Sequence, residues 1–71
     1  MTNHELVMAA MRMDPGRGYT AGELASFIWG PEFRKARCGT VARILSVASK
    51  YGFVELIGRN PAGVKVWRLK K

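Results

Sequence analysis

The sequence has a single cysteine, Cys38, and a single histidine, His4. One cysteine cannot form an internal disulfide, and it cannot build a cysteine-rich metal site. No apolar run approaches the roughly 20 residues of a membrane-spanning helix, and no signal-peptide pattern is present. We therefore expect a soluble, cytoplasmic protein that holds no metal, uses no cofactor and does not associate with a membrane.

The arrangements that enzymes use for catalysis are also missing. His4 and Cys38 lie in different predicted elements, so they do not pair as nucleophile and base. No two carboxylates are placed for acid–base chemistry, and no glycine-rich phosphate loop occurs. These absences predict a protein that is not an enzyme and binds no small-molecule ligand.

Acidic residues are scarce, above all in the second half of the chain. Five Asp and Glu oppose twelve Lys and Arg, for a net charge of +7. Residues 34–71 hold ten Lys or Arg against Glu55 alone, which sums to +9, whereas residues 1–33 sum to −2. This asymmetry favours one surface for phosphates and another for a different contact. The alternative is a basic protein whose charge only keeps it in solution.

The chain of 71 residues is long enough for one small domain, residues 1–71. Its apolar fraction of 48% is ordinary for a globular protein and too high for a disordered tail. Turn residues divide it into a helix, a short extended segment around Tyr19, two further helices and a β-hairpin.

Two capping boxes predict where the first two helices begin. In each, a threonine is followed three residues later by a glutamate, as in Thr2–Glu5 and Thr20–Glu23. Residues 14–18 end the first helix, and residues 29–31 end the second because a residue before proline avoids the α conformation. Helical spacing places Leu6, Ala9, Ala10 and Met13 on one side of the first helix, and Leu24, Phe27 and Ile28 on the apolar side of the second. We also expect Met8 and Met11 to be packing residues.

The third helix is predicted to end at Gly52, where a left-handed residue is needed. Its buried stripe follows the i, i+3, i+4, i+7 spacing of Val41, Ile44, Leu45 and Ala48. The opposite face holds two cations and no acid: Gly39, Arg43, Ser46 and Lys50. The helix begins either at Pro31 or near Thr40. We favour a break near Gly39, since glycine costs about 1 kcal/mol relative to alanine inside a helix.

Residues 53–57 and 64–69 are rich in β-formers, and the turn-rich loop 58–63 between them predicts an antiparallel hairpin. Pairing across this loop sets Ile57 opposite Val64 and Val54 opposite Trp67. The predicted core face is Val54, Leu56, Trp67 and Leu69. The other face, Phe53, Ile57, Val64 and Val66, is too apolar for full solvation, so it packs on the first helix or meets another subunit.

These segments, in this order, resemble a winged helix-turn-helix domain. The resemblance rests on residues 18–25 (GYTAGELA), 40–45 (TVARIL), 50–55 (KYGFVE) and 66–69 (VWRL). It implies an α+β fold of three helices with a C-terminal β-hairpin as the wing. One departure is the connection from Trp29 to Gly39, which is longer than the 3–4-residue turn of a simple helix-turn-helix.

The resemblance implies binding to double-stranded DNA by a small transcriptional regulator, with the third helix in the major groove and the hairpin over the backbone or minor groove. We expect Arg43 to read bases, because arginine pairs bidentately with guanine. Thr40 and Ser46 are expected to bond bases or phosphates. The residues expected to contact mainly phosphate are Arg34, Lys35, Arg37, Lys50, Lys65 and Arg68.

The end of the hairpin and of the chain complete the expected DNA contacts. Arg59 and Asn60 lie at the tip of the loop, where a cation can enter a narrow minor groove. Lys70 and Lys71 would add a contribution that is independent of sequence. A homodimer, formed through the first helix or the outer hairpin face, is the natural way for so small a module to gain affinity.

Structural roles stand beside these functional ones. Arg37 either contacts phosphate, or packs over Phe33, or pairs with Glu32. We expect Trp29 and Trp67 in the core rather than as stacking platforms, and Cys38 as a small buried side chain. The main alternative function is a winged-helix module that binds proteins. RNA binding is a variant of the first hypothesis, although no paired aromatics on a strand surface favour it.

Overall fold

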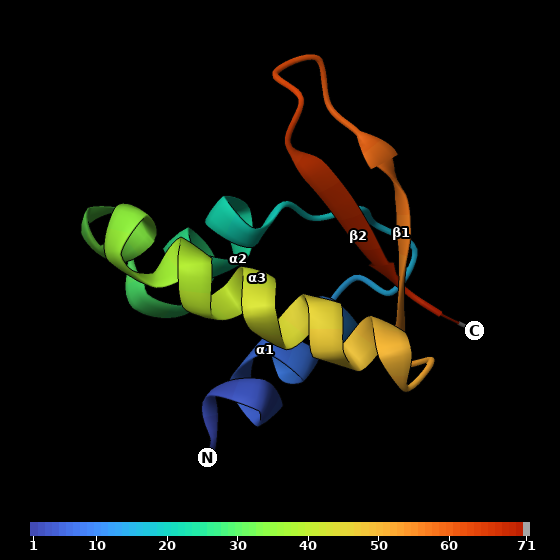
Figure 1. The fold of residues 1–71 in the computed structure, drawn as a ribbon. Coiled ribbons are helices and arrows are strands. Elements are labelled where there is room, and N and C mark those ends of the chain that lie inside the picture. The colour runs from blue at the N-terminus through green and yellow to red at the C-terminus, as the bar shows by residue number, and fades with distance from the viewer. Residues whose placement is uncertain (71) are drawn as a thin grey trace.

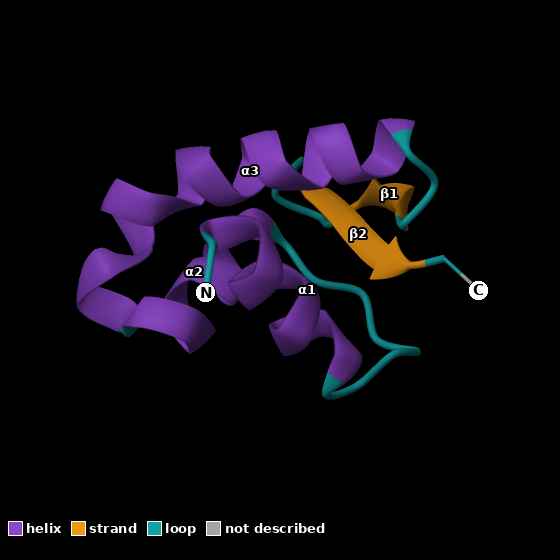
Figure 2. Cartoon of the chain, turned by 90° about the horizontal axis from the view of Figure 1, so that it is seen from below, coloured by secondary structure: helices purple, strands orange, loops and turns teal. Residues whose placement is uncertain are grey.

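Three α-helices precede a two-stranded antiparallel hairpin in the computed structural model, which describes residues 1–70 (Figure 1). The elements are α1 (Asn3–Arg12), α2 (Ala21–Trp29), the 3₁₀ turn η1 (Pro31–Phe33), α3 (Arg34–Lys50), β1 (Val54–Arg59) and β2 (Lys65–Leu69). The fold is α+β, and α3 lies across one side of the molecule with α1 and α2 beneath it (Figure 2). No helix within residues 1–70 has the length and apolar character needed to cross a bilayer.

Both capping boxes are confirmed. The Thr2 hydroxyl accepts the Glu5 backbone N–H at 3.2 Å, and the Glu5 carboxylate accepts the Thr2 N–H at 3.0 Å. Thr20 and Glu23 repeat this exchange at 3.1 and 3.0 Å. Each pair satisfies two N–H groups that a helix N-terminus otherwise leaves without partners. The predicted end of α2 is also confirmed, because Gly30 is its C-cap.

The predicted buried faces of α1 and α2 were partly wrong. On α1 the buried residues are Val7, Met8, Ala10 and Met11, which confirms the packing role expected of the two methionines. Met13 is 73% exposed because α1 ends at Arg12 and Met13 is its C-cap. On α2 the buried residues are Leu24 and Ala25, while Phe27 is 60% exposed. Helical spacing alone does not say which flank a neighbour will cover, and α2 packs mainly against α3.

The predicted break near Gly39 was wrong, because α3 is one continuous helix of 17 residues. The 3₁₀ turn after Gly30 leads directly into it. Val41, Leu45 and Ala48 are fully buried, and Ile44 is partly buried against the core. Burying a side chain of this size stabilises by about 1.5–3 kcal/mol, which outweighs the cost of one glycine. Gly39 itself is exposed.

The predicted hairpin register was wrong by two residues. Val54 pairs with Leu69 and Leu56 with Trp67, so the core face keeps the predicted members. A shift of two residues leaves every side chain on the same face, which is why the hydrophobic pattern does not distinguish the two registers. Leu56 is nevertheless 47% exposed, although Trp67 opposite it is buried. An irregularity between Leu56 and Gly58 then changes the pairing again.

Tyr19 lies in an extended segment, as predicted, and the structure adds that this segment forms an isolated antiparallel bridge to β2 at Trp67. Tyr19 and Trp67 exchange two backbone hydrogen bonds of 2.7 Å each. The preceding Gly18 lies tightly under the outer face of the hairpin. A Cβ there would be 2.7 Å from Val66 Cγ1 and 2.9 Å from Ile57 Cδ1. Part of the outer face therefore packs on the loop after α1.

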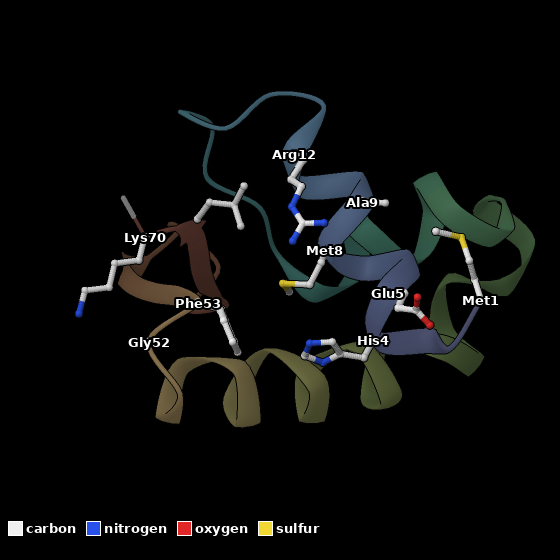
Figure 3. A pocket seen from close by; sticks show the side chains of 10 residues that line it. Met1, His4, Glu5, Met8, Ala9, Arg12, Gly52, Phe53 and Lys70 are labelled. Atoms are coloured by element: carbon white, nitrogen blue, oxygen red, sulfur yellow. The ribbon is translucent and has the colours of Figure 1, made fainter.

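Phe53 also belongs to the outer face of the hairpin. It lines a groove of about 440 Å³ between α1 and the start of the hairpin, and Met8 and His4 of α1 point toward it (Figure 3). Phe53 is itself 56% exposed, so the outer face shares a groove with the first helix and is not packed against it.

Candidate nucleic-acid interface

The outer face of α3 is exposed. Gly39, Arg43, Ser46 and Lys50 are all exposed, as is Thr40 on the adjoining flank. The buried stripe on the opposite side holds the helix in this orientation, as the periodicity predicted. The ion pairs found within residues 1–70 are Arg17–Glu23 and Arg68–Glu55, so neither Arg43 nor Lys50 is neutralised by a described carboxylate.

A groove of about 640 Å³ runs between the N-terminus of α2, the first half of α3 and the hairpin loop. Lys35, Gly39 and Ala42 line it from α3, and Asn60 and Val64 line it from the loop. Its α3 wall combines small side chains with two cations, Arg34 and Lys35. Small side chains let a polyanion backbone approach closely. Neither Ala42 nor Val64 was predicted to line a binding groove, because only the approach of the hairpin creates this groove.

Arg34 also lines the groove and lies against the first turn of α2. Its Nε is 2.8 Å from where a Cβ on Gly22 would stand, so the guanidinium covers that glycine. The backbone N–H of Thr20 holds the pKa of the nearby Glu23 carboxyl below its ordinary value of 4.5, with smaller contributions from Arg17 and Arg34. The α2 terminus therefore carries a guanidinium beside an ionised, hydrogen-bonded carboxylate.

The loop residues Arg59 and Asn60 order the hairpin tip. Asn60 Oδ1 accepts the backbone N–H groups of Ala62 and Val64, each at 3.0 Å. Arg59 Nη1 donates to the Gly63 carbonyl at 2.8 Å. Asn60 thus serves the turn with its acceptor oxygen, whereas Arg59 remains exposed and has further N–H groups to donate. Lys65, its partner in the ladder, is exposed as well.

Two of the predicted phosphate contacts are occupied within the fold. Arg68 donates to Glu55 Oε1 through Nε at 3.2 Å and through Nη2 at 2.5 Å. The Arg37 guanidinium lies 5.0 Å from the centroid of the Trp29 ring. A cation over an aromatic face is attracted by the ring quadrupole. This contact differs from both structural alternatives that we considered for Arg37.

The remaining residues singled out in the sequence lie away from the outer face of α3 or pack within the fold. Trp67 is buried and Trp29 packs partly against the core, in keeping with a structural role. Cys38 is half-buried in the groove rather than fully buried, with Sγ 3.5 Å from the Lys35 carbonyl. Lys70 lines the separate groove beside α1, and Lys71 lies outside the described residues. Across residues 1–70 no cluster of three or more potential metal ligands occurs.

Comparison of the chain with known proteins found no relative. No family model, no curated protein and no solved structure matches the chain.

Proposed function

We propose that this protein is a winged helix-turn-helix DNA-binding domain that acts as a small, cytoplasmic transcriptional regulator. The observation that supports this most is the exposed cationic face of α3 beside a groove whose far wall is the hairpin loop. A helix with a slender, positively charged outer face matches the dimensions and charge of a DNA major groove. In this proposal α3 is the recognition helix and the hairpin is the wing.

The proposed contacts divide by chemistry. Arg43 reads a base edge, with Thr40 and Ser46 beside it, because these three lie on the exposed side of the recognition helix. The cations that contact phosphate are Arg34, Lys35, Lys50, Arg59 and Lys65. Arg37 and Arg68 leave this set because Trp29 and Glu55 already engage them.

Selection of bound duplexes from a random pool tests the proposal. We expect enrichment of a defined site, and a palindromic one would identify a dimer. R43A should cost about 1–3 kcal/mol on the selected site and relax the preference at one position. The matched control is R12A, which removes the same charge from α1 and should keep the preference. No enrichment at low salt would refute DNA binding, and equal loss on all sequences would refute the role of Arg43.

A protein-binding function is the second candidate, and one observation favours it. Met13 and Phe27, both largely exposed, line a depression of about 250 Å³ between the end of α1 and α2. Neighbouring exposed apolar side chains of this kind are typical of protein contact sites. Under this function the protein would bind a partner with equal affinity in high salt, and M13S/F27S would abolish binding. Under DNA binding the same double variant would keep its affinity for the selected half-site.

A further inference from the structure

The irregularity in the hairpin is a β-bulge in β1. Up to Leu56 the ladder is regular, with Leu56 opposite Trp67. The next pair is Gly58 with Val66, so Ile57 has no partner and two residues of β1 occupy the space of one. Gly58 has φ = +144°, a backbone conformation that residues with a Cβ rarely adopt. A Cβ at Gly58 would meet nothing within 4 Å, so the conformation, not the space, restricts this position.

The bulge decides which face of the hairpin carries Arg59. In the observed ladder Arg59 pairs with Lys65, and directly paired residues share a face. If the regular pairing of Val54 to Leu56 simply continued, Arg59 would stand opposite Val64 and Lys65 opposite Gly58. The two cations would then lie on opposite faces, because successive residues of a strand alternate.

We propose that this bulge is a positioning device and Gly58 a positioning residue, which together set Arg59 and Lys65 side by side so that the wing binds the DNA backbone with two cations at once. The inference rests on the proposed function. Directly opposed residues in an antiparallel pair have Cβ atoms about 4.5–5.5 Å apart, which lets both side chains reach the same stretch of backbone. The loop supports this arrangement, since Arg59 Nη1 is bonded to the Gly63 carbonyl and Asn60 Oδ1 fixes the turn.

Two changes at position 58 distinguish the bulge itself from the placement of Arg59 beside Lys65 that it produces. G58V keeps the residue count but penalises the positive φ, so the strand escapes to regular pairing and Arg59 changes face. Deletion of Gly58 also removes the bulge, but it leaves Ile57 opposite Val66 and Arg59 opposite Lys65. The substitution should therefore harm DNA binding more than the deletion does. G16V is the matched control, because Gly16 has open space and no positive φ.

Affinity for the selected duplex is measured against salt for all four proteins, with cross-strand NOEs between residues 59 and 65 reporting the register. We expect G58V to lose one phosphate contact, which lowers the slope of log K against log salt by about 0.9 and the affinity at 0.1 M salt by about eightfold. The deletion and G16V should keep the wild-type slope and lie within about twofold of its affinity.

The inference is overturned if G58V binds like the wild type, or if the deletion loses as much as G58V. It is also overturned if G58V retains the 59–65 NOEs, since the glycine is then not needed for the register. Failure of the wild type to bind any duplex would instead remove the proposed function, and the NOEs would still show whether the bulge sets the pairing.

Discussion

The salt dependence of DNA binding gives the sharpest quantitative test of the interface. Five cations remain as phosphate contacts: Arg34, Lys35, Lys50, Arg59 and Lys65. Each phosphate contact contributes about −0.9 to the slope of log K against log salt, so five predict a slope of about −4.5. Raising salt from 50 to 200 mM should then weaken binding by about 500-fold.

The structure changes this number substantially. If Arg37 and Arg68 also contacted phosphate, seven contacts would give a slope of about −6.3 and a loss of about 6,000-fold over the same range. The two figures differ by more than tenfold, which fluorescence anisotropy on a labelled duplex at 50, 100 and 200 mM salt resolves easily. The smaller loss is expected because Trp29 and Glu55 hold these two guanidinium groups.

Variants decide which residues contribute to the slope. K35Q should lower the slope by about 0.9, because Lys35 lines the groove and has no carboxylate partner within residues 1–70. R37Q should leave it unchanged. E55Q/R68Q removes an ion pair without changing the net charge, so it should also leave the slope unchanged. A wild-type slope near −6.3, lowered by R37Q and by E55Q/R68Q, would show that the two occupied arginines leave their partners to contact DNA.

Three further predictions concern stability and are checked by thermal unfolding followed by circular dichroism. L45A should cost about 2–5 kcal/mol because Leu45 is fully buried, and a small domain loses about 4–8 °C in Tm for each kcal/mol. G18A should cost about 1–3 kcal/mol through the clash with the hairpin, whereas G16A, in open space, should be neutral; equal effects would refute the close approach. T20A should cost about 1 kcal/mol through loss of the helix cap. The folded state lowers the pKa of the Glu23 carboxyl below 4.5. The contribution of Glu23 to stability is therefore present above pH 4.5 and is lost as the pH falls through the lowered pKa. E23Q should remove that part of the acid sensitivity, and an unchanged pH profile would show that the capping carboxylate does not stabilise the fold.

The features that the sequence predicted well depend on residues close together in the chain. The capping boxes at Thr2 and Thr20 need only a threonine and a glutamate three residues apart. The end of α2 follows from Gly30 and Pro31, and the exposed face of α3 follows from the spacing of its buried stripe. Each of these is a local preference that the tertiary structure did not override.

The features that it missed depend on partners from distant elements. The two-residue error in register placed Glu55 opposite Val66, which hid the Glu55–Arg68 ion pair, and the bulge that moves Arg59 has no signature beyond one glycine. Arg37 and Trp29 meet across the α2–α3 connection, where helical periodicity is interrupted. Gly39 stays helical because the packing of α3 outweighs its low propensity. The identity of the exposed cations was thus predictable, but their availability was not.

The paired hydrogen bonds between Tyr19 and Trp67 have a consequence for how the protein would meet a duplex. Tyr19 immediately precedes Thr20, the N-cap of α2, so the hairpin and the helical body are fastened at the point where α2 begins. These two hydrogen bonds oppose a swing of the hairpin base away from the helical body. Under the proposed function the distance between the helix and hairpin contacts is therefore restrained at the base of the hairpin. The protein would favour duplexes whose groove widths already match this spacing.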